Sequence, residues 1–236
     1  MTDDATPSRP AAPAAGAPPL SATPRTVLRR GREKARTSRA DLLDVLAAGV
    51  VCHLGVVVDG APMVVPTIYG FDAETLYLHG SVASRSLAGP PETVCVTVTA
   101  VDGLVLARSV FEHSVNYRSA MLYGRPRDVT DGDEKRAGLR LLTEHVAPGQ
   151  WEHARQPDRR ELAATRLWAL SLDEASVKVR TGPPDDADSA DAVAGRWAGE
   201  LPVVTRFGAP VPDPALPPGT PVPAHIAARA GTRPGG

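Results

Sequence analysis

Several features that mark common classes of protein are missing from this 236-residue sequence. No run of about 18 apolar residues could cross a membrane. The first residues contain Asp3, Asp4 and an alanine–proline tract, whereas a secretory signal needs a basic start and an apolar stretch. We therefore expect a cytoplasmic protein that has no contact with a membrane.

Cysteine and net charge are also low. The two cysteines, Cys52 and Cys95, both lie in apolar runs, which favours buried free thiols over a disulfide framework. The formal net charge is −1, from 26 basic and 27 acidic side chains, so no long-range field attracts nucleic acid. A local basic run is more typical of a solvated segment before a helix, and it consists of Arg30, Arg32, Lys34, Arg36 and Arg39.

Familiar catalytic motifs are absent as well. The sequence has no GxxxxGKS phosphate loop, no GxGxxG after a strand, no CxxC, no HExxH and no GxSxG. This argues against simple ATPases, dinucleotide dehydrogenases of the usual kind, zinc hydrolases and serine esterases. No spacing supports a metal site built from Cys52, His53 and His79.

Proline and glycine, with 24 and 21 residues, gather toward the two ends of the chain. This composition predicts three parts: a disordered Ala/Pro-rich tail over residues 1–24, a folded domain over 25–180 and a Pro/Gly-rich extension over 181–236. Residues 196–204 are expected to dock as a short segment, so the extension is partly docked.

Short strands joined by tight turns dominate the central region. A helix is expected from the cap Ser38 to Gly49, and the Asp59-Gly60 pair predicts a two-residue hairpin turn. Asp102-Gly103 predicts a second hairpin. The expected strands cover residues 50–58, 63–68, 75–78, 93–100, 104–110, 116–129 and 167–179, with a turn at 69–73, a loop leading into a short helix at 80–87, and further helices at 131–146 and 157–165. The pattern favours a mainly β protein with peripheral helices, built as an antiparallel barrel.

Four segments together resemble the FMN-binding split-barrel superfamily that includes pyridoxamine 5'-phosphate oxidase. They read VCHLGVVVDGAPMVVPTIYGFD, LYLHGSVASRSL, VCVTVTAVDGLVLARS followed by HSVNYRS, and ASVKVRTG. The closest resemblance is to the branch related to nitroimidazole reductases, and it extends from about Arg25 to Arg180. It implies a split β-barrel of Greek-key-like topology that binds FMN.

Residues 79–87 are the expected site of the FMN phosphate. Ser81, Ser84 and Arg85 supply hydroxyls and a cation, Gly80 allows close approach of the backbone, and a helix start would direct N–H groups at the anion. Taken alone, the segment also fits an ordinary polar turn between strands.

The resemblance also places residues around the flavin ring. It implies that Pro66, Thr67, Ile68 and Tyr69 line the isoalloxazine. It places Lys178 and Arg180, which share one face of a strand, near the cofactor. Arg108 and Ser109 are comparable candidates.

His79 is the candidate catalytic residue, because it directly precedes the phosphate segment and matches a histidine near the flavin in nitroimidazole-reductase-like proteins. An imidazole there would donate a proton or orient a substrate at neutral pH. A structural role at the end of a strand is the alternative.

The resemblance implies a homodimer with flavin at the subunit interface. The expected function is an FMN-dependent oxidoreductase, in which NAD(P)H reduces the flavin and a nitro-aromatic, quinone or flavin-like acceptor takes the electrons. The alternatives are a non-catalytic flavin carrier or redox sensor, and a barrel that binds haem or a deazaflavin. Two features depart from the family: no basic substrate-phosphate site is evident near the C-terminus, and Gly89-Pro90-Pro91 shortens the helix after the serine–arginine motif.

Overall fold

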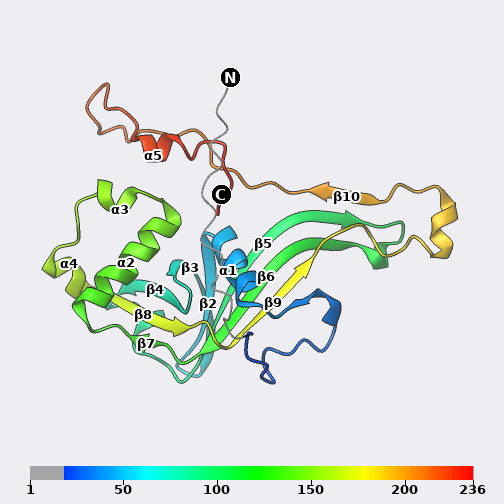
Figure 1. Ribbon diagram of the computed structural model, residues 1–236, viewed down its shortest axis with the longest axis horizontal. Helices are drawn as coiled ribbons and strands as arrows, with labels where there is room; N and C mark the ends of the chain where they lie inside the picture. The colour runs from blue at the N-terminus through cyan, green and yellow to red at the C-terminus, as the bar shows by residue number, and fades with distance from the viewer. Residues whose placement is uncertain (1–18, 236) are drawn as a thin grey trace.

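The computed structural model describes residues 19–235, in which an antiparallel ten-stranded sheet forms the body of the protein (Figure 1). The strands are β1 (Ala35–Arg36), β2 (Val51–Val58), β3 (Ala61–Phe71), β4 (Thr75–Ser81), β5 (Val94–Leu106), β6 (Ser114–Gly124), β7 (Arg127–Asp128), β8 (Thr165–Ser171), β9 (Ala175–Arg180) and β10 (Gly199–Pro202). Their order is β1-β9-β6-β5-β2-β3-β4-β8-β7, and β10 pairs with β5. This architecture confirms the predicted mainly β half-barrel with helices at its edges.

Most of the α-helices lie toward one end of the sheet, α1 lies near its middle, and the β5–β6 hairpin projects from the other end (Figure 1). The α-helices are α1 (Arg39–Ala48), α2 (Gly132–Val146), α3 (Gln150–His153), α4 (Arg159–Ala164) and α5 (Ala224–Ala227), and the 3-10 helices are η1 (Arg32–Lys34), η2 (Arg85–Leu87), η3 (Val110–Glu112) and η4 (Ala190–Ala194). Among the residues that the structure describes, no helix has the length and apolar character needed to cross a membrane.

Helix α1 begins where its sequence predicts. The Ser38 hydroxyl accepts a hydrogen bond from the N–H of Asp41, which satisfies one of the free donors of the first turn. Leu42, Val45 and Leu46 are fully buried against the sheet. Gly49 ends the helix with extended backbone, and a side chain there would collide with Val98 and with the Tyr69 hydroxyl.

Local turn and cap signals are confirmed elsewhere too. Asp59 and Gly60 both have positive φ, 53° and 77°, as a two-residue hairpin turn between β2 and β3 requires. Asp131 caps α2 by accepting from two backbone N–H groups. Asp158 forms a capping box with Glu161 at the start of α4.

The main core fills the inside of the curved sheet. Its fully buried side chains include Leu54 of β2, Tyr69 of β3, Leu122 of β6 and Leu170 of β8. A smaller cluster around Leu142 and Tyr77 lies between α2 and the sheet. Since α2 covers β3 and β4 on the opposite face, this part of the sheet is buried on both sides.

The predicted hairpin at Asp102-Gly103 is wrong. Strand β5 continues through both residues to Leu106, and only a register irregularity marks the position. The Asp102 carboxylate accepts two hydrogen bonds from Arg118 of β6, at 2.9 and 2.8 Å, and β10 packs on the other side of Gly103. Partners on two neighbouring strands therefore keep the chain extended here. We call residues 102–114, which include the actual turn around η3, the arm.

Other boundaries differ because non-local pairing extends or divides the strands. β3 continues through residues 69–71, where a turn was expected, since it pairs there with β4. The expected strand over 167–179 is two strands, β8 beside β4 and β9 beside β6. The expected strand over 116–129 is likewise divided into β6 and β7. Helix α3 was not predicted.

The two terminal segments are only partly as predicted. Residues 1–18 of the expected disordered tail lie outside the described residues, but residues 19–24 are packed: Leu20 is buried and its N–H donates to the Thr37 carbonyl. In the C-terminal extension, the expected docking segment contains β10, which pairs with residues 103–106 of β5.

Candidate functional site

The segment that follows β4 folds back tightly on the sheet. The N–H of Val82 donates to the Ala164 carbonyl, and the N–H of Ser84 donates to the Ser81 carbonyl. The buried Leu87 side chain anchors the end of the segment, and it lies so close to Gly80 that a larger residue there would displace the end of the Leu87 side chain. Gly80 therefore shapes the loop through packing.

The polar groups of this loop face solvent together. Ser81 and Arg85 are exposed, while the Ser84 and Ser86 hydroxyls lie 3.0 Å apart. Arg85 pairs with Asp59 of the β2–β3 turn at 2.9 Å, and the two side chains are 71% and 82% exposed. Such an exposed pair contributes little stability, so the guanidinium is free to turn to an anion.

The expected helix start contributes less than predicted. η2 is a single 3-10 turn of three residues. A helix this short aligns few peptide dipoles, so the side chains and the loop backbone must provide the attraction for a phosphate.

Alternation along β3 separates the four residues expected to line a flavin ring. Pro66 and Ile68 lie on the outer face of the sheet, whereas Thr67 and Tyr69 point to the barrel interior. Tyr69 is fully buried, and its hydroxyl lies 2.6 Å from the Leu46 carbonyl oxygen and 3.0 Å from that of Gly49. The sequence predicted that Tyr69 lines the flavin ring. In the structure its side chain lies in the core instead, where its hydroxyl binds the end of α1.

His79 and Ile68 line one cavity of about 260 Å³ between α2 and the outer face of β3 and β4. The other walls are mainly apolar and come from Leu139, Leu142, Thr143, Val146, Ala147 and Gln150. Burial lowers the pKa of the His79 imidazole. Within the described residues its Nδ1 is buried and has no hydrogen-bond partner. The cavity wall thus includes a neutral imidazole, whose buried Nδ1 has no hydrogen-bond partner among those residues.

Four predicted residues lie far from this cavity along the sheet. Arg108 binds the buried Asp186 through its backbone N–H and its guanidinium, both at 2.6 Å. The Ser109 carbonyl contacts the His113 ring. Arg180 is buried and donates to the Asn116 side chain, and Lys178 is on β9 near β1. In a single chain these residues stabilise the arm and its base, and they do not join the His79 loop.

Sequence reasoning missed two features around the site. Arg166 of β8 donates to the carbonyl oxygens of Leu87 and Ala88 and so holds the end of the loop. A larger cavity of about 430 Å³ lies between the outer sheet face, including Val51 and His53, and C-terminal residues such as Arg233. No local pattern in the sequence indicates that these distant segments meet.

The buried Cys52 thiol is not a candidate nucleophile. Burial raises the pKa of Cys52 to about 12, so the sulfur stays protonated and is a poor nucleophile.

A family model described as pyridoxamine 5'-phosphate oxidase matches residues 38–179, more than half of the chain. The chain belongs to the pyridoxamine 5'-phosphate oxidase family. The members of this family are flavin-binding split barrels, so the fold and the family expected from the sequence are both confirmed.

Two solved structures are similar over nearly their whole length. The flavocytochrome Anf3 from Azotobacter vinelandii is 37% identical, with a TM-score of 0.84, and the match covers 90% of this chain and 100% of that one. The FAD and heme binding protein from Mycobacterium smegmatis is 41% identical, with a TM-score of 0.79, and the match covers 84% and 98%.

A structure assigned to 5-nitroimidazole antibiotic resistance, from Bacteroides thetaiotaomicron, shares the fold at 22% identity. Its TM-score is 0.51, and the match covers 61% of this chain and 86% of that one. No curated protein matches the sequence.

Proposed function

We propose that this protein is a redox protein that carries FAD and haem, with the FAD phosphates at the loop after β4 and the haem iron bound by His79. The observation that carries the proposal is the 37–41% identity to a flavocytochrome and to an FAD and heme binding protein, over 84–90% of this chain. FAD thus replaces FMN as the proposed flavin.

The loop after β4 suits a flavin phosphate. Three serine hydroxyls and one guanidinium stand together on the surface, and the Arg85–Asp59 pair is exposed enough to exchange for a phosphate oxygen. Gly80 packs closely against the buried Leu87, which holds the end of this loop against the sheet.

His79 suits an iron ligand. A neutral imidazole is the form that binds a metal, and burial keeps His79 neutral at pH 7. Its unpartnered Nδ1 and the apolar wall from α2 are unexplained by the fold alone. When bound, haem exchanges one electron and a flavin exchanges one or two; the chain supplies the ligand atom and excludes water from it.

His79→Ala tests the haem assignment. We expect the purified variant to lose the haem absorbance band while it keeps its flavin and its far-ultraviolet circular dichroism spectrum. His113→Ala is the matched control, because His113 is an exposed histidine on the arm and lines neither cavity of the site. A haem content unchanged by His79→Ala would contradict the assignment.

Arg85→Ala tests the phosphate site. A charge-assisted hydrogen bond is worth about 1.5–3 kcal/mol, so flavin affinity should fall roughly 10- to 150-fold. Arg125→Ala is the control, since Arg125 also forms an exposed ion pair, with Glu92 at 3.2 Å. Flavin released by heat is identified by chromatography, and equal flavin affinity in both variants would remove Arg85 from the site.

A second candidate function is an FMN-dependent reductase of a small acceptor, with NAD(P)H as the donor. The cavity of about 260 Å³ beside His79 favours it, because a nitro-aromatic or quinone ring could lie against the imidazole. Recovery of FMN without haem, together with NAD(P)H-dependent reduction of a nitro-aromatic compound, would support this function. Bound flavin without any turnover would indicate a carrier or sensor.

A further inference from the structure

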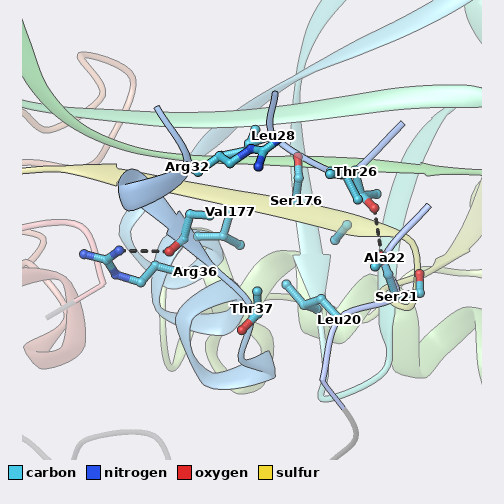
Figure 2. A pocket seen from close by; sticks show the side chains of 13 residues that line it. Leu20, Ser21, Ala22, Thr26, Leu28, Arg32, Arg36, Thr37, Ser176 and Val177 are labelled. Carbon is cyan, nitrogen blue, oxygen red and sulfur yellow. Dashed lines mark hydrogen bonds between the residues drawn. The ribbon is translucent and has the colours of Figure 1, made fainter. Parts of the chain in front are cut away.

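A separate cavity of about 190 Å³ lies between the N-terminal segment and β9, away from the His79 loop (Figure 2). Leu20 and Val177 form part of its apolar floor, and Val27 and Leu28 form part of its wall. An apolar cavity of about 150 Å³ can hold a benzene molecule, so this one accepts an aromatic side chain.

One cation stands at the edge of this cavity without a partner. Arg32 lies over it in Figure 2, and among the described residues it forms no ion pair or side-chain hydrogen bond. Arg36, the other lining cation, is turned back, and its guanidinium donates to the carbonyl oxygens of Glu33 and Ala35. The cavity therefore combines an apolar floor with one available guanidinium.

The tip of the arm carries the complementary groups. Phe111 in η3 is 91% exposed; Trp197, which lies outside the arm just before β10, is also 69% exposed. A phenyl ring this exposed gains free energy when it leaves water for an apolar cavity. Glu112 follows Phe111 directly, and its carboxylate has no ion-pair partner within residues 19–235.

The arm of the same chain does not reach this cavity. Ser176, in the cavity wall, pairs with Met121, seven residues along β6 from Ser114 at the base of the tip. At about 3.3 Å per strand residue, these positions are roughly 23 Å apart. A second molecule is needed to bring the two surfaces together.

We propose that the arm tip of one copy of this chain docks in the N-terminal cavity of a second copy. Phe111 enters the apolar floor, and Glu112 pairs with Arg32 of the other copy. In a two-fold dimer the same contact forms twice, so each weak contact is doubled. This contact between the arm tip and the N-terminal cavity does not depend on which cofactor the protein binds.

Site-directed crosslinking tests the contact. Two differently tagged chains are co-expressed, both with Cys95→Ser, one carrying Glu112→Cys and the other Arg32→Cys. A short bismaleimide should then join the two tags. In the control, Glu92→Cys replaces Arg32→Cys, because Glu92 is an exposed residue in the loop before β5. No joining of the tags, or equal joining in the control, would overturn the proposal.

Dimer dissociation measured by analytical ultracentrifugation gives an independent test. Burial of a Phe side chain is worth about 1.5–3 kcal/mol, so Phe111→Ser should weaken the dimer at least tenfold. Glu112→Arg and Arg32→Glu should each weaken it, and the double variant should recover most of the loss. A Phe111→Ser dimer as tight as the wild type, a monomeric wild-type protein, or no recovery in the double variant would each refute it.

Discussion

Two half-buried histidines show how position decides the chemistry of a single residue. Burial lowers the pKa values of both His79 and His145. His145 donates from Nε2 to the Gly49 carbonyl at 2.8 Å and packs against the rings of Tyr69 and Phe71. His79 lines a cavity, and its buried Nδ1 has no hydrogen-bond partner among the described residues. The same residue type therefore closes the core at one position and lines a cavity at the other.

The lowered pKa values predict that the cofactor-free protein is less stable in mild acid. Below the ordinary histidine value of 6.5, the unfolded chain binds protons that the folded chain does not bind. The free energy of unfolding, measured by urea denaturation, should therefore fall as the pH falls from 7 to 5.

His145→Gln keeps an N–H donor and should make this fall smaller. His113→Gln, at an exposed position on the arm, is the control. An identical pH dependence in the wild type and in His145→Gln would show that His145 does not contribute.

At the scale of elements, the approach of α2 to β3 positions the His79 cavity. A side chain at Gly70 of β3 would lie 2.6 Å from the backbone carbonyl carbon of Leu141 in α2. The absent side chain lets the helix backbone rest directly on the strand. Leu139 and Leu142 then reach the outer sheet face and close the cavity.

Gly70→Ala should therefore displace α2 from the sheet. Overpacking against backbone has few ways to relax, so we expect a loss of about 3 kcal/mol or more in the free energy of unfolding. Gly89→Ala is the control, since nothing lies within 4 Å of the added carbon there. Equal stability of the two variants, measured by urea denaturation, would contradict this role of Gly70.

At the scale of the whole molecule, the C-terminal extension is attached to the barrel without being part of its core. Every buried residue of the main core cluster lies between Leu20 and Val177. The extension contacts the arm through β10 and reaches α3 through His225, which lies 2.9 Å from the Gln150 side chain.

Deletion of residues 190–236 should leave a folded barrel with a less protected arm. We expect one cooperative unfolding transition to remain. Loss of about 1.4 kcal/mol of local stability would make the arm open about tenfold more often, and limited proteolysis within 102–114 should be faster by that factor. An unfolded deletion variant, or unchanged cleavage of the arm, would contradict the prediction.

Short-range signals in the sequence determined several features of this protein correctly. The Ser38 cap, the Asp59-Gly60 turn and the Asp131 cap depend on atoms within three residues of each other, so the residues themselves decide them. The set of strand motifs, in its order, was sufficient for the half-barrel and the family.

Only the tertiary structure decided features that depend on distant partners. Asp102-Gly103 stays extended because Arg118 and β10 hold it, and the Tyr69 hydroxyl is bound in the core by the carbonyl oxygens of Leu46 and Gly49 at the end of α1. Ile68 and His79 line one cavity with α2, and Arg180 lies apart from them. Both facts follow from the strand order and the helix packing. Local propensity carries no information on those contacts, since the residues involved are tens of positions apart in the chain.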